Sequence, residues 1–137
     1  MKLHAWAVCA CLCVAEAATT PWLTVVGDPA DPLADTIQVN PLFVRKDGPR
    51  RVMEVRVSRS QERTSTDGIR FRAFHGLVAF DCEARVARFL SSQFYNAPLW
   101  RDPGARLDYP ESAWRSVEFR GFEPNPRDRV VQAACSP

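Results

Sequence analysis

The chain has 137 residues and a formal net charge of +2, from 18 Lys and Arg against 16 Asp and Glu. This near balance argues against a dedicated nucleic-acid binder, which would carry a strong basic excess. The length predicts one domain that is large enough to bury a hydrophobic core.

The first 17 residues have the pattern of a signal peptide. Lys2 forms a short basic region, an apolar run extends to Ala15, and Ala15-Glu16-Ala17 is a small-x-small cleavage site. We therefore expect export to the periplasm, the cell surface or the medium, with residues 18–137 as one exported domain. The run is too short for a permanent transmembrane helix, which needs about 20 apolar residues, and no later stretch is long enough.

Two other interpretations of this leader stay open. One is a buried N-terminal helix of the folded domain. The other is a lipoprotein signal, because Cys9, Cys11 and Cys13 all lie in the leader. The residues before Cys11 match the lipid-attachment pattern poorly.

The exported part has the pattern of short strands separated by glycine and proline. Alternation of polar and apolar residues predicts strands over 22–26, 36–39, 52–58, 69–81, 83–95 and 114–119, and 42–45 is expected to continue the second strand past Pro41. Lys46-Asp47-Gly48-Pro49 is a strong turn signal. Polar or proline-rich stretches at 27–32, 58–68 and 96–111 are expected to be loops.

Two details of these strands carry further expectations. Gly76 lies within the strand over 69–81 and suggests a β-bulge. The stretch 83–90 also fits a helical stripe, so a helix is the alternative there.

The end of the chain changes to a helical period. Asn125 is a good N-cap, Pro126 suits the first helical position and Asp128 lies in the first turn. Apolar residues at 130, 131, 134 and 135 then form a helical stripe. Strands followed by one helix predict an α+β fold, in which an antiparallel sheet of about six strands carries the C-terminal helix on one face.

Removal of the leader leaves two of the five cysteines, Cys82 and Cys135. Two cysteines in an exported domain predict one structural disulfide, which would tether the helix to a connection between strands. Closing that loop of about 53 residues is worth about 4 kcal/mol in the chain-entropy model. The alternative is two unpaired buried thiols. A zinc site is disfavoured because two cysteines without neighbouring histidines cannot complete its shell.

Catalytic patterns are weak throughout the exported part. His75 is its only histidine and lies within a predicted strand, so it is the best candidate if the chain is a hydrolase. The acid pairs Asp28 with Asp31 and Asp102 with Asp108 fall in predicted loops, where carboxylates are usually solvated. We therefore predict no catalytic, cofactor-binding or metal-binding residues, no cofactor and no enzymatic activity.

Arginine and aromatic residues instead suggest a binding surface. Sixteen of the 17 cations after the leader are arginine, which grips carboxylates, sulfates and phosphates in bidentate fashion. Codon composition is the alternative explanation. Aromatic residues also interleave with arginines between positions 70 and 114. Aromatic and arginine side chains commonly anchor interfaces; the alternative is that these aromatics fill the core. The residues concerned are Phe71, Phe74, Phe80, Phe89, Phe94, Tyr95, Trp100 and Trp114, with Arg70, Arg72, Arg85, Arg88 and Arg101.

Several of these features together resemble the bacterial surface-adhesin protein E-like family. The resemblance covers the whole exported part, and its most specific element is Asp81-Cys82 followed by Arg85 and Arg88, with the near-terminal Cys135. The other matching features are Trp22-Leu23, Ile37-Gln38-Val39-Asn40-Pro41, the Lys46-Asp47-Gly48 turn before the strand at 52–57, and Trp114.

The resemblance implies a sheet with a disulfide-tethered C-terminal helix and the capacity to form a homodimer. Named members of the family are adhesins that bind host extracellular-matrix proteins. The resemblance therefore implies a non-enzymatic binding module for protein or glycan partners at the cell envelope or host matrix. A soluble periplasmic accessory or structural protein is the alternative, because the family's adhesin is lipid-anchored and this leader lacks a good lipid site.

Overall fold

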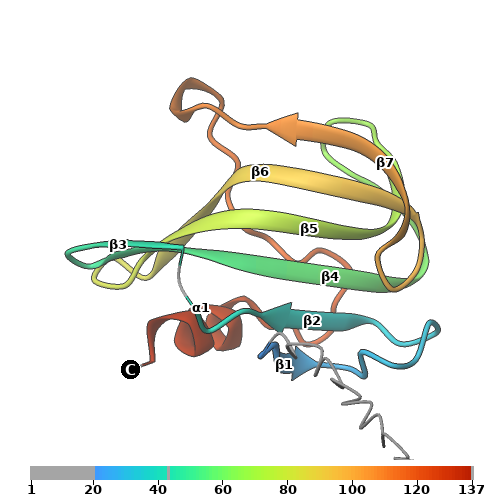
Figure 1. Cartoon of the computed structure of the whole chain (residues 1–137), viewed down its shortest axis with the longest axis horizontal. Coiled ribbons are helices and arrows are strands. Elements are labelled where there is room, and N and C mark those ends of the chain that lie inside the picture. Colours follow the sequence, from blue (N-terminus) through green and yellow to red (C-terminus); the bar gives the residue numbers. More distant parts are fainter. Residues whose placement is uncertain (1–20, 43, 137) are drawn as a thin grey trace, which may run out of the picture.

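The computed structural model describes residues 21–42 and 44–136 (Figure 1). The predicted signal peptide, with Cys9, Cys11 and Cys13, lies outside the described residues. Within the described ranges no helix is long and apolar enough to cross a membrane. The elements there are β1 (Leu23–Val26), β2 (Thr36–Val39), β3 (Arg45–Asp47), β4 (Arg50–Thr64), β5 (Arg70–Asp81), β6 (Val86–Ala97), β7 (Arg101–Asp108), a 3₁₀ helix (Glu111–Ala113) and α1 (Arg127–Cys135).

All the strands join one antiparallel sheet in the order β1-β2-β4-β5-β6-β7, and β3 pairs with β4 beside β2 (Figure 1). The long strands β4, β5 and β6 form its centre. The predicted antiparallel sheet with one C-terminal helix is confirmed, with seven strands in the described chain instead of about six.

Two predicted loops were wrong. Residues 59–64 continue β4, and Arg63 and Thr64 pair with the start of β5. The end of this strand is exposed on both sides, so it lacks the alternation that would have revealed it. The stretch 96–111 contains β7, the last strand of the sheet, which Pro103 does not break because an edge strand needs hydrogen bonds on one side only.

The predicted strand at 114–119 was also wrong. Only Ser116 forms an isolated bridge, to Arg88, flanked by the hydrogen bonds from Phe89 N–H to the Arg115 carbonyl and from Val117 N–H to the Ala87 carbonyl. Its alternating pattern arises because Val117 and Phe119 are buried while Glu118 is exposed. For 83–90 the strand was the correct choice over the helix: β6 begins at Val86, after the turn at 82–85.

Gly76 matters for close packing. The irregularity in the pairing of β5 with β6 comes just after it, between Leu77 and Val78, and the extra residue is Leu90 of β6. Gly76 itself pairs regularly on both sides. A Cβ there would lie 2.9 Å from Phe89 Cε1, so glycine is required for the approach of this ring. The predicted bulge is therefore present, but in the neighbouring strand.

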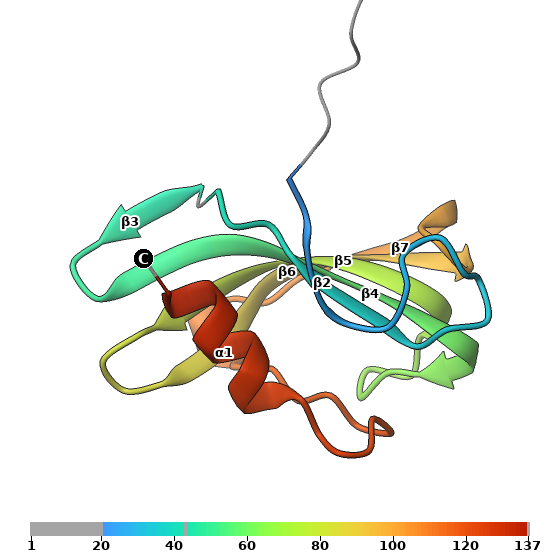
Figure 2. The same ribbon diagram turned by 90° about the horizontal axis from the view of Figure 1, so that it is seen from below.

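The core lies between the sheet and the C-terminal segment. Met53, Val55 and Val57 alternate along β4 and are almost completely buried. Helix α1 lies against β1, β2, β4 and β5, and residues 109–126 cross the sheet on the same side before it (Figure 2). The buried cluster comprises these three residues with Ile37, Val39, Val78, Phe80, Ala87, Val117, Phe119, Phe122, Val130, Val131 and Ala134.

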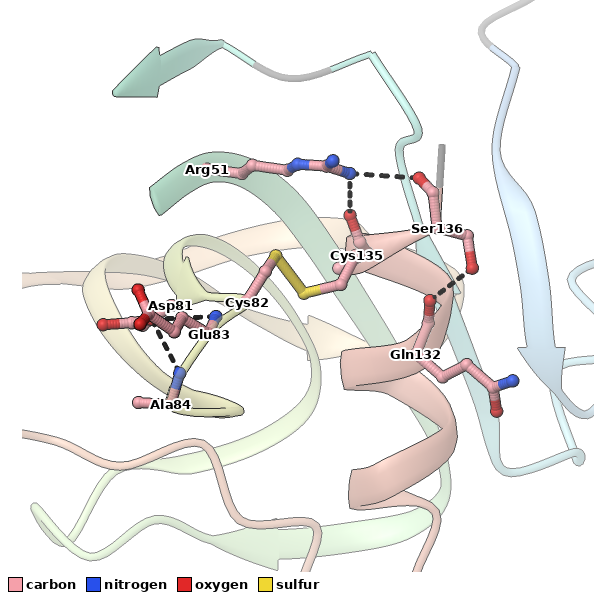
Figure 3. The surroundings of a disulfide bond; sticks show 9 residues. Arg51, Asp81, Cys82, Glu83, Ala84, Gln132, Cys135 and Ser136 are labelled. Atoms are coloured by element: carbon pink, nitrogen blue, oxygen red, sulfur yellow. Dashed lines mark hydrogen bonds between the residues drawn. A yellow bond between two sulfur atoms is a disulfide. The ribbon is translucent and has the colours of Figure 1, made fainter. Parts of the chain in front are cut away.

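A disulfide between Cys82 and Cys135 joins the turn after β5 to the last helical residue of α1 (Figure 3). The Cα atoms are 5.5 Å apart, and the bond spans 53 residues of sequence. The predicted bond is therefore present, with the connection and the helix end where they were expected. Both cysteines are half-buried against the core.

Hydrogen bonds hold both ends of this tether (Figure 3). The Asp81 carboxylate accepts from the backbone N–H groups of Glu83 and Ala84, at 3.1 and 2.9 Å, which shapes the turn that carries Cys82. Arg51 Nη1 donates to the carbonyls of Ala134 and Ser136, at 3.1 and 3.0 Å. A cation at the C-terminus of a helix also opposes the helix dipole. At the other end of α1, the Asn125 side chain accepts from Arg127 N–H, and the helix begins one residue after Pro126.

Replacement of both cysteines by serine should lower the free energy of unfolding of the exported domain by about 4 kcal/mol, because the loop of the unfolded chain is no longer closed. Urea denaturation followed by circular dichroism measures this. A reductant should lower the stability of the wild type to the same level and leave the double variant unchanged. Equal stability of the oxidised wild type and C82S/C135S would contradict the expected role of the bond.

Candidate binding site

Polar side chains form a row across the centre of the sheet. Gln38 of β2, Arg56 of β4 and His75 of β5 are direct cross-strand partners, so their side chains share one face. Val55 and Val57, the neighbours of Arg56, belong to the buried core, so Arg56 points to the other face. We call this group the Arg56 surface; it comprises Trp22, Gln38, Glu54, Arg56, His75 and Trp100.

Arg56 is the centre of this surface. Its guanidinium carbon lies 4.2 Å from the ring centroid of Trp22 and 4.0 Å from that of Trp100. Its Nε donates to Gln38 Oε1 at 2.7 Å. Burial lowers the pKa of Arg56, while the nearby Glu54 opposes this shift. Two indoles and one amide thus replace much of the water around the positively charged guanidinium. Cation–π attraction is strongest when the cation is desolvated in this way.

Trp100 is held in an uncommon backbone conformation. It lies in the turn between β6 and β7, where Leu99 has φ +55° and Trp100 has φ +59°. Residues other than glycine in this left-handed region cost on the order of 1–3 kcal/mol. Two hydrogen bonds fix the turn: Leu99 N–H donates to Ser58 Oγ at 3.0 Å, and Trp100 Nε1 donates to the Phe74 carbonyl at 3.1 Å. The fold therefore accepts strain to place this indole over Arg56.

Glu54 and His75 form the second polar contact of the surface. His75 Nε2 lies 3.3 Å from Glu54 Oε1, and the side chains are 34% and 35% exposed. Asn40 Nδ2 donates to the other carboxylate oxygen at 3.0 Å. Trp22 packs edge-on against the imidazole, with centroids 5.5 Å apart. Burial is the main cause that lowers the pKa of His75 below its ordinary 6.5, and Glu54 works against it.

The residues of this surface differ from those that the sequence singled out. Of the predicted aromatics, Trp100 belongs to it, whereas Phe71, Phe80 and Phe94 are buried, as the alternative interpretation expected. Neither Trp22 nor Arg56 was on the list. The sequence did contain a signal for Arg56: it alternates with the apolar residues of its strand, which places its side chain on the face opposite the core. No local pattern predicts that residues 22, 56 and 100 meet.

The arginines on the list serve other purposes. Arg70 pairs with Glu62, and Arg72 donates to the backbone carbonyls of Arg59 and Ser60. Arg88 lies over Trp114, with the guanidinium carbon 5.0 Å from the ring centroid. Arg85 is exposed in the turn after Cys82, and Arg101 is exposed in β7.

The acid pairs have local roles. Asp28 and Asp31 accept hydrogen bonds from the backbone of Ala30 and Leu33 in the loop after β1. Asp102 and Asp108 lie at the two ends of β7, not in a loop as predicted. Among residues 21–42 and 44–136, no group of three His, Cys, Asp or Glu side chains has the arrangement of a metal site.

No family model, curated protein or solved structure matches this chain. The resemblance to the surface-adhesin protein E-like family therefore stays a prediction.

The stability of the domain should depend on the protonation of His75. Because the folded pKa lies below 6.5, the unfolded state takes up the proton first as the pH falls. The His75 contribution is therefore complete above pH 6.5 and is lost as the pH drops through 6.5 toward the folded pKa. Urea midpoints at pH 7.5 and 5.5 should show this decrease, and H75Q should show a smaller one. The same decrease in both proteins would exclude His75 as its source.

Proposed function

We propose that this protein is an exported, non-enzymatic binding module whose partner docks on the Arg56 surface. The observation that carries the proposal is the placement of two tryptophans, one before β1 and one in the turn between β6 and β7, with ring centroids within 4.2 Å of one guanidinium carbon. Helix α1 contacts β1, β2, β4 and β5 and shares the buried cluster with Val55 and Val57, whereas Arg56 points to the other side of the sheet.

The composition of the surface is that of an interface centre. Tryptophan and arginine are the residues most enriched among binding hot spots, where they are well packed and partly desolvated. Trp22, Arg56 and Trp100 are half-buried and pack on one another, so these contacts are in place without a partner. Order in the free state reduces the entropy lost on binding. The strained turn at Trp100 fits the same interpretation, since strain of this kind collects at binding sites.

The chemistry of the surface favours a partner with aromatic or sugar rings and carboxylate or sulfate groups. Indole rings provide flat apolar faces, and the guanidinium donates hydrogen bonds to oxyanions. Protein and acidic glycan ligands both offer these groups. A homodimer, which the family resemblance implies, is a further proposal.

The absence of catalysis is part of this proposal, and His75 is the residue on which it can be checked. Its partners are the Glu54 carboxylate and the edge of Trp22. In the part of the chain that the structure describes, no serine, threonine or cysteine side chain donates a hydrogen bond to it, which a His-activated nucleophile would require. The contact with Glu54 does keep an acid near the histidine, so a general esterase screen is the direct check.

Replacement of Trp22 by alanine should weaken partner binding about 30-fold, the change that corresponds to a hot spot worth 2 kcal/mol. The probes are host basement-membrane extract, heparin and isolated peptidoglycan, each immobilised, with the exported domain in solution. W114A is the matched control, because Trp114 also lies over an arginine and is 48% exposed, but lies outside the Arg56 surface. Absence of saturable binding to all three probes, or equal losses in both variants, would contradict the proposal.

Export itself is also a proposal, and the periplasmic alternative differs from the adhesin in location. The disulfide is compatible with either, since both compartments are oxidising. Cell fractionation with mass spectrometry of the recovered chain should give a mass that starts at Ala18, without lipid and with Cys82 and Cys135 bonded. An exclusively periplasmic pool would favour the accessory protein, and a chain that retains residues 1–17 would refute cleavage.

A further inference from the structure

A second, separate feature lies on the side of the sheet that faces α1. A cleft of about 450 Å³ opens between the sheet and residues 115–122. This volume is within the 300–1,000 Å³ range of typical ligand sites. The Arg56 surface contributes no residue to it. We call it the phenylalanine cleft; its apolar lining is Val57, Phe71, Phe74, Phe89, Phe94, Phe119 and Phe122.

The cleft follows from the dimensions of the fold. Six strands in a row span roughly 24 Å across the sheet, whereas an α-helix is about 10 Å wide. Helix α1 has nine residues and contacts the β1, β2, β4 and β5 part of the sheet. Beyond the helix, the irregular segment 115–122 is the cover. Phe74 of β5 and Phe89 of β6 consequently stay only half-buried, although they point toward the core side.

The floor of the cleft is a continuous run of aromatic rings. Neighbouring centroids lie 6.5 Å apart for Tyr109 and Phe89, 5.7 Å for Phe89 and Phe74, and 5.7 Å for Phe74 and Phe71. Phe94 packs on the last ring at 5.3 Å. The run thus presents an extended apolar strip, which suits a flexible chain of methylene groups better than a compact ligand.

The rim of the cleft is positively charged. Four arginines line it, against the two carboxylates Asp67 and Glu118. Arg115 is bound to Asp67 at 2.6 Å, and Arg120 to Glu118 at 3.0 Å. Hydrogen bonding to Arg115 lowers the pKa of Asp67. Burial and the Asp67 charge raise the pKa of Tyr109 to about 12, so its phenol stays neutral.

The remaining two rim arginines, Arg59 and Arg63, are not equivalent. Arg59 is 2% exposed; its Nε lies 3.3 Å from Asp35 Oδ1, its Nη2 donates to the Gly121 carbonyl, and its guanidinium carbon lies 3.8 Å from the ring centroid of Phe122. Arg63 is exposed and lies within reach of the same glycine, since a Cβ on Gly121 would be 3.3 Å from its Nη1. Among the described residues, Arg63 has no carboxylate within ion-pair distance. Burial is the main cause that lowers the pKa of Arg59; the Asp35 carboxylate opposes this shift, and the like charge of Arg63 adds to it.

We propose that the phenylalanine cleft binds a single-chain fatty acid, with the acyl chain on the aromatic strip and the carboxylate at Arg63. Arg63 is the rim arginine without a carboxylate partner among the described residues, so one negative charge on a ligand would balance the rim. A fatty-acid carboxylate carries one such charge at neutral pH, whereas a phosphate monoester carries about −1.5 to −2. A carboxylate at Arg63 also offsets the repulsion between the Arg59 and Arg63 guanidinium groups. The fatty-acid site is independent of the Arg56 surface.

Isothermal titration calorimetry of the exported chain with dodecanoate, below its micelle concentration, tests this assignment. Dodecanoate should bind saturably with one site per chain. Acetate should show no measurable binding, because it lacks the chain, and dodecyltrimethylammonium should bind at least tenfold more weakly because its head is positive. Tighter binding of dodecyl phosphate would overturn the carboxylate assignment, and equal binding of the cationic amphiphile would overturn the role of the rim.

Two variants locate the site, with a matched control. R63Q should weaken dodecanoate binding about tenfold, and T66W should weaken it further, because Thr66 is an exposed residue of the cleft where a large side chain narrows the mouth. R106Q is the control, since Arg106 is an exposed arginine of β7 outside the cleft. All three positions are at the surface, so the variants should fold, which unfolding curves verify. Unchanged affinity in both R63Q and T66W would refute the site even if dodecanoate binds elsewhere, and none of these results depends on partner binding at Trp22.

Discussion

The position of one short helix determines most of what this fold offers to other molecules. Helix α1 has few residues with which to hold itself on the sheet: Val130, Val131 and Ala134 are its buried positions. The Cys82–Cys135 bond fixes its C-terminal end, and Arg51 binds the carbonyls there. A free energy of about 4 kcal/mol from loop closure is comparable to the net stability of a small domain. The tether is therefore a large contribution to the stability of the folded chain in which α1 holds this position.

A fixed helix makes the two sides of the sheet unequal. On the side of α1, the helix and the segment 115–122 together are too narrow to cover β5 and β6 fully, and the phenylalanine cleft remains. On the other side, the central strands carry the polar row of Gln38, Arg56 and His75. A sheet with one covered face normally has a solvated opposite face. Here the indoles of Trp22 and Trp100 shield part of that face, whereas an ordinary solvated face would carry polar side chains exposed to water.

The sequence predicted the elements that alternate or have clear end signals, and it failed where burial does not alternate. Strands β2 and β5, the turn near Gly48 and helix α1 all have such signals, and the two cysteines left after removal of the predicted leader predicted the disulfide. The exposed end of β4 and the proline-containing edge strand β7 have none, so both were expected to be loops. For 114–119 the error was the opposite one: a strand was predicted where none forms. Alternating burial requires only that successive side chains point to the core and to solvent in turn, which an irregular segment can also do. Several residues of the two candidate sites were on the predicted list, but their grouping was not predictable, since each site joins residues from at least four separate parts of the chain.

The arginines, which far outnumber the lysines in this chain, fall into groups according to what each guanidinium contacts. Codon composition explains a high number of arginines, but it does not explain their surroundings. Arg51 binds helix carbonyls, Arg115 and Arg120 bind carboxylates, and Arg56 lies against two indoles. The stacking of Arg56 between two indoles uses the planar, delocalised guanidinium that lysine lacks, so geometry favours arginine at that position. Arg63 is the contrasting case: an exposed cation beside a second arginine gains nothing within the described chain, and a bound anion is the partner that its position lacks.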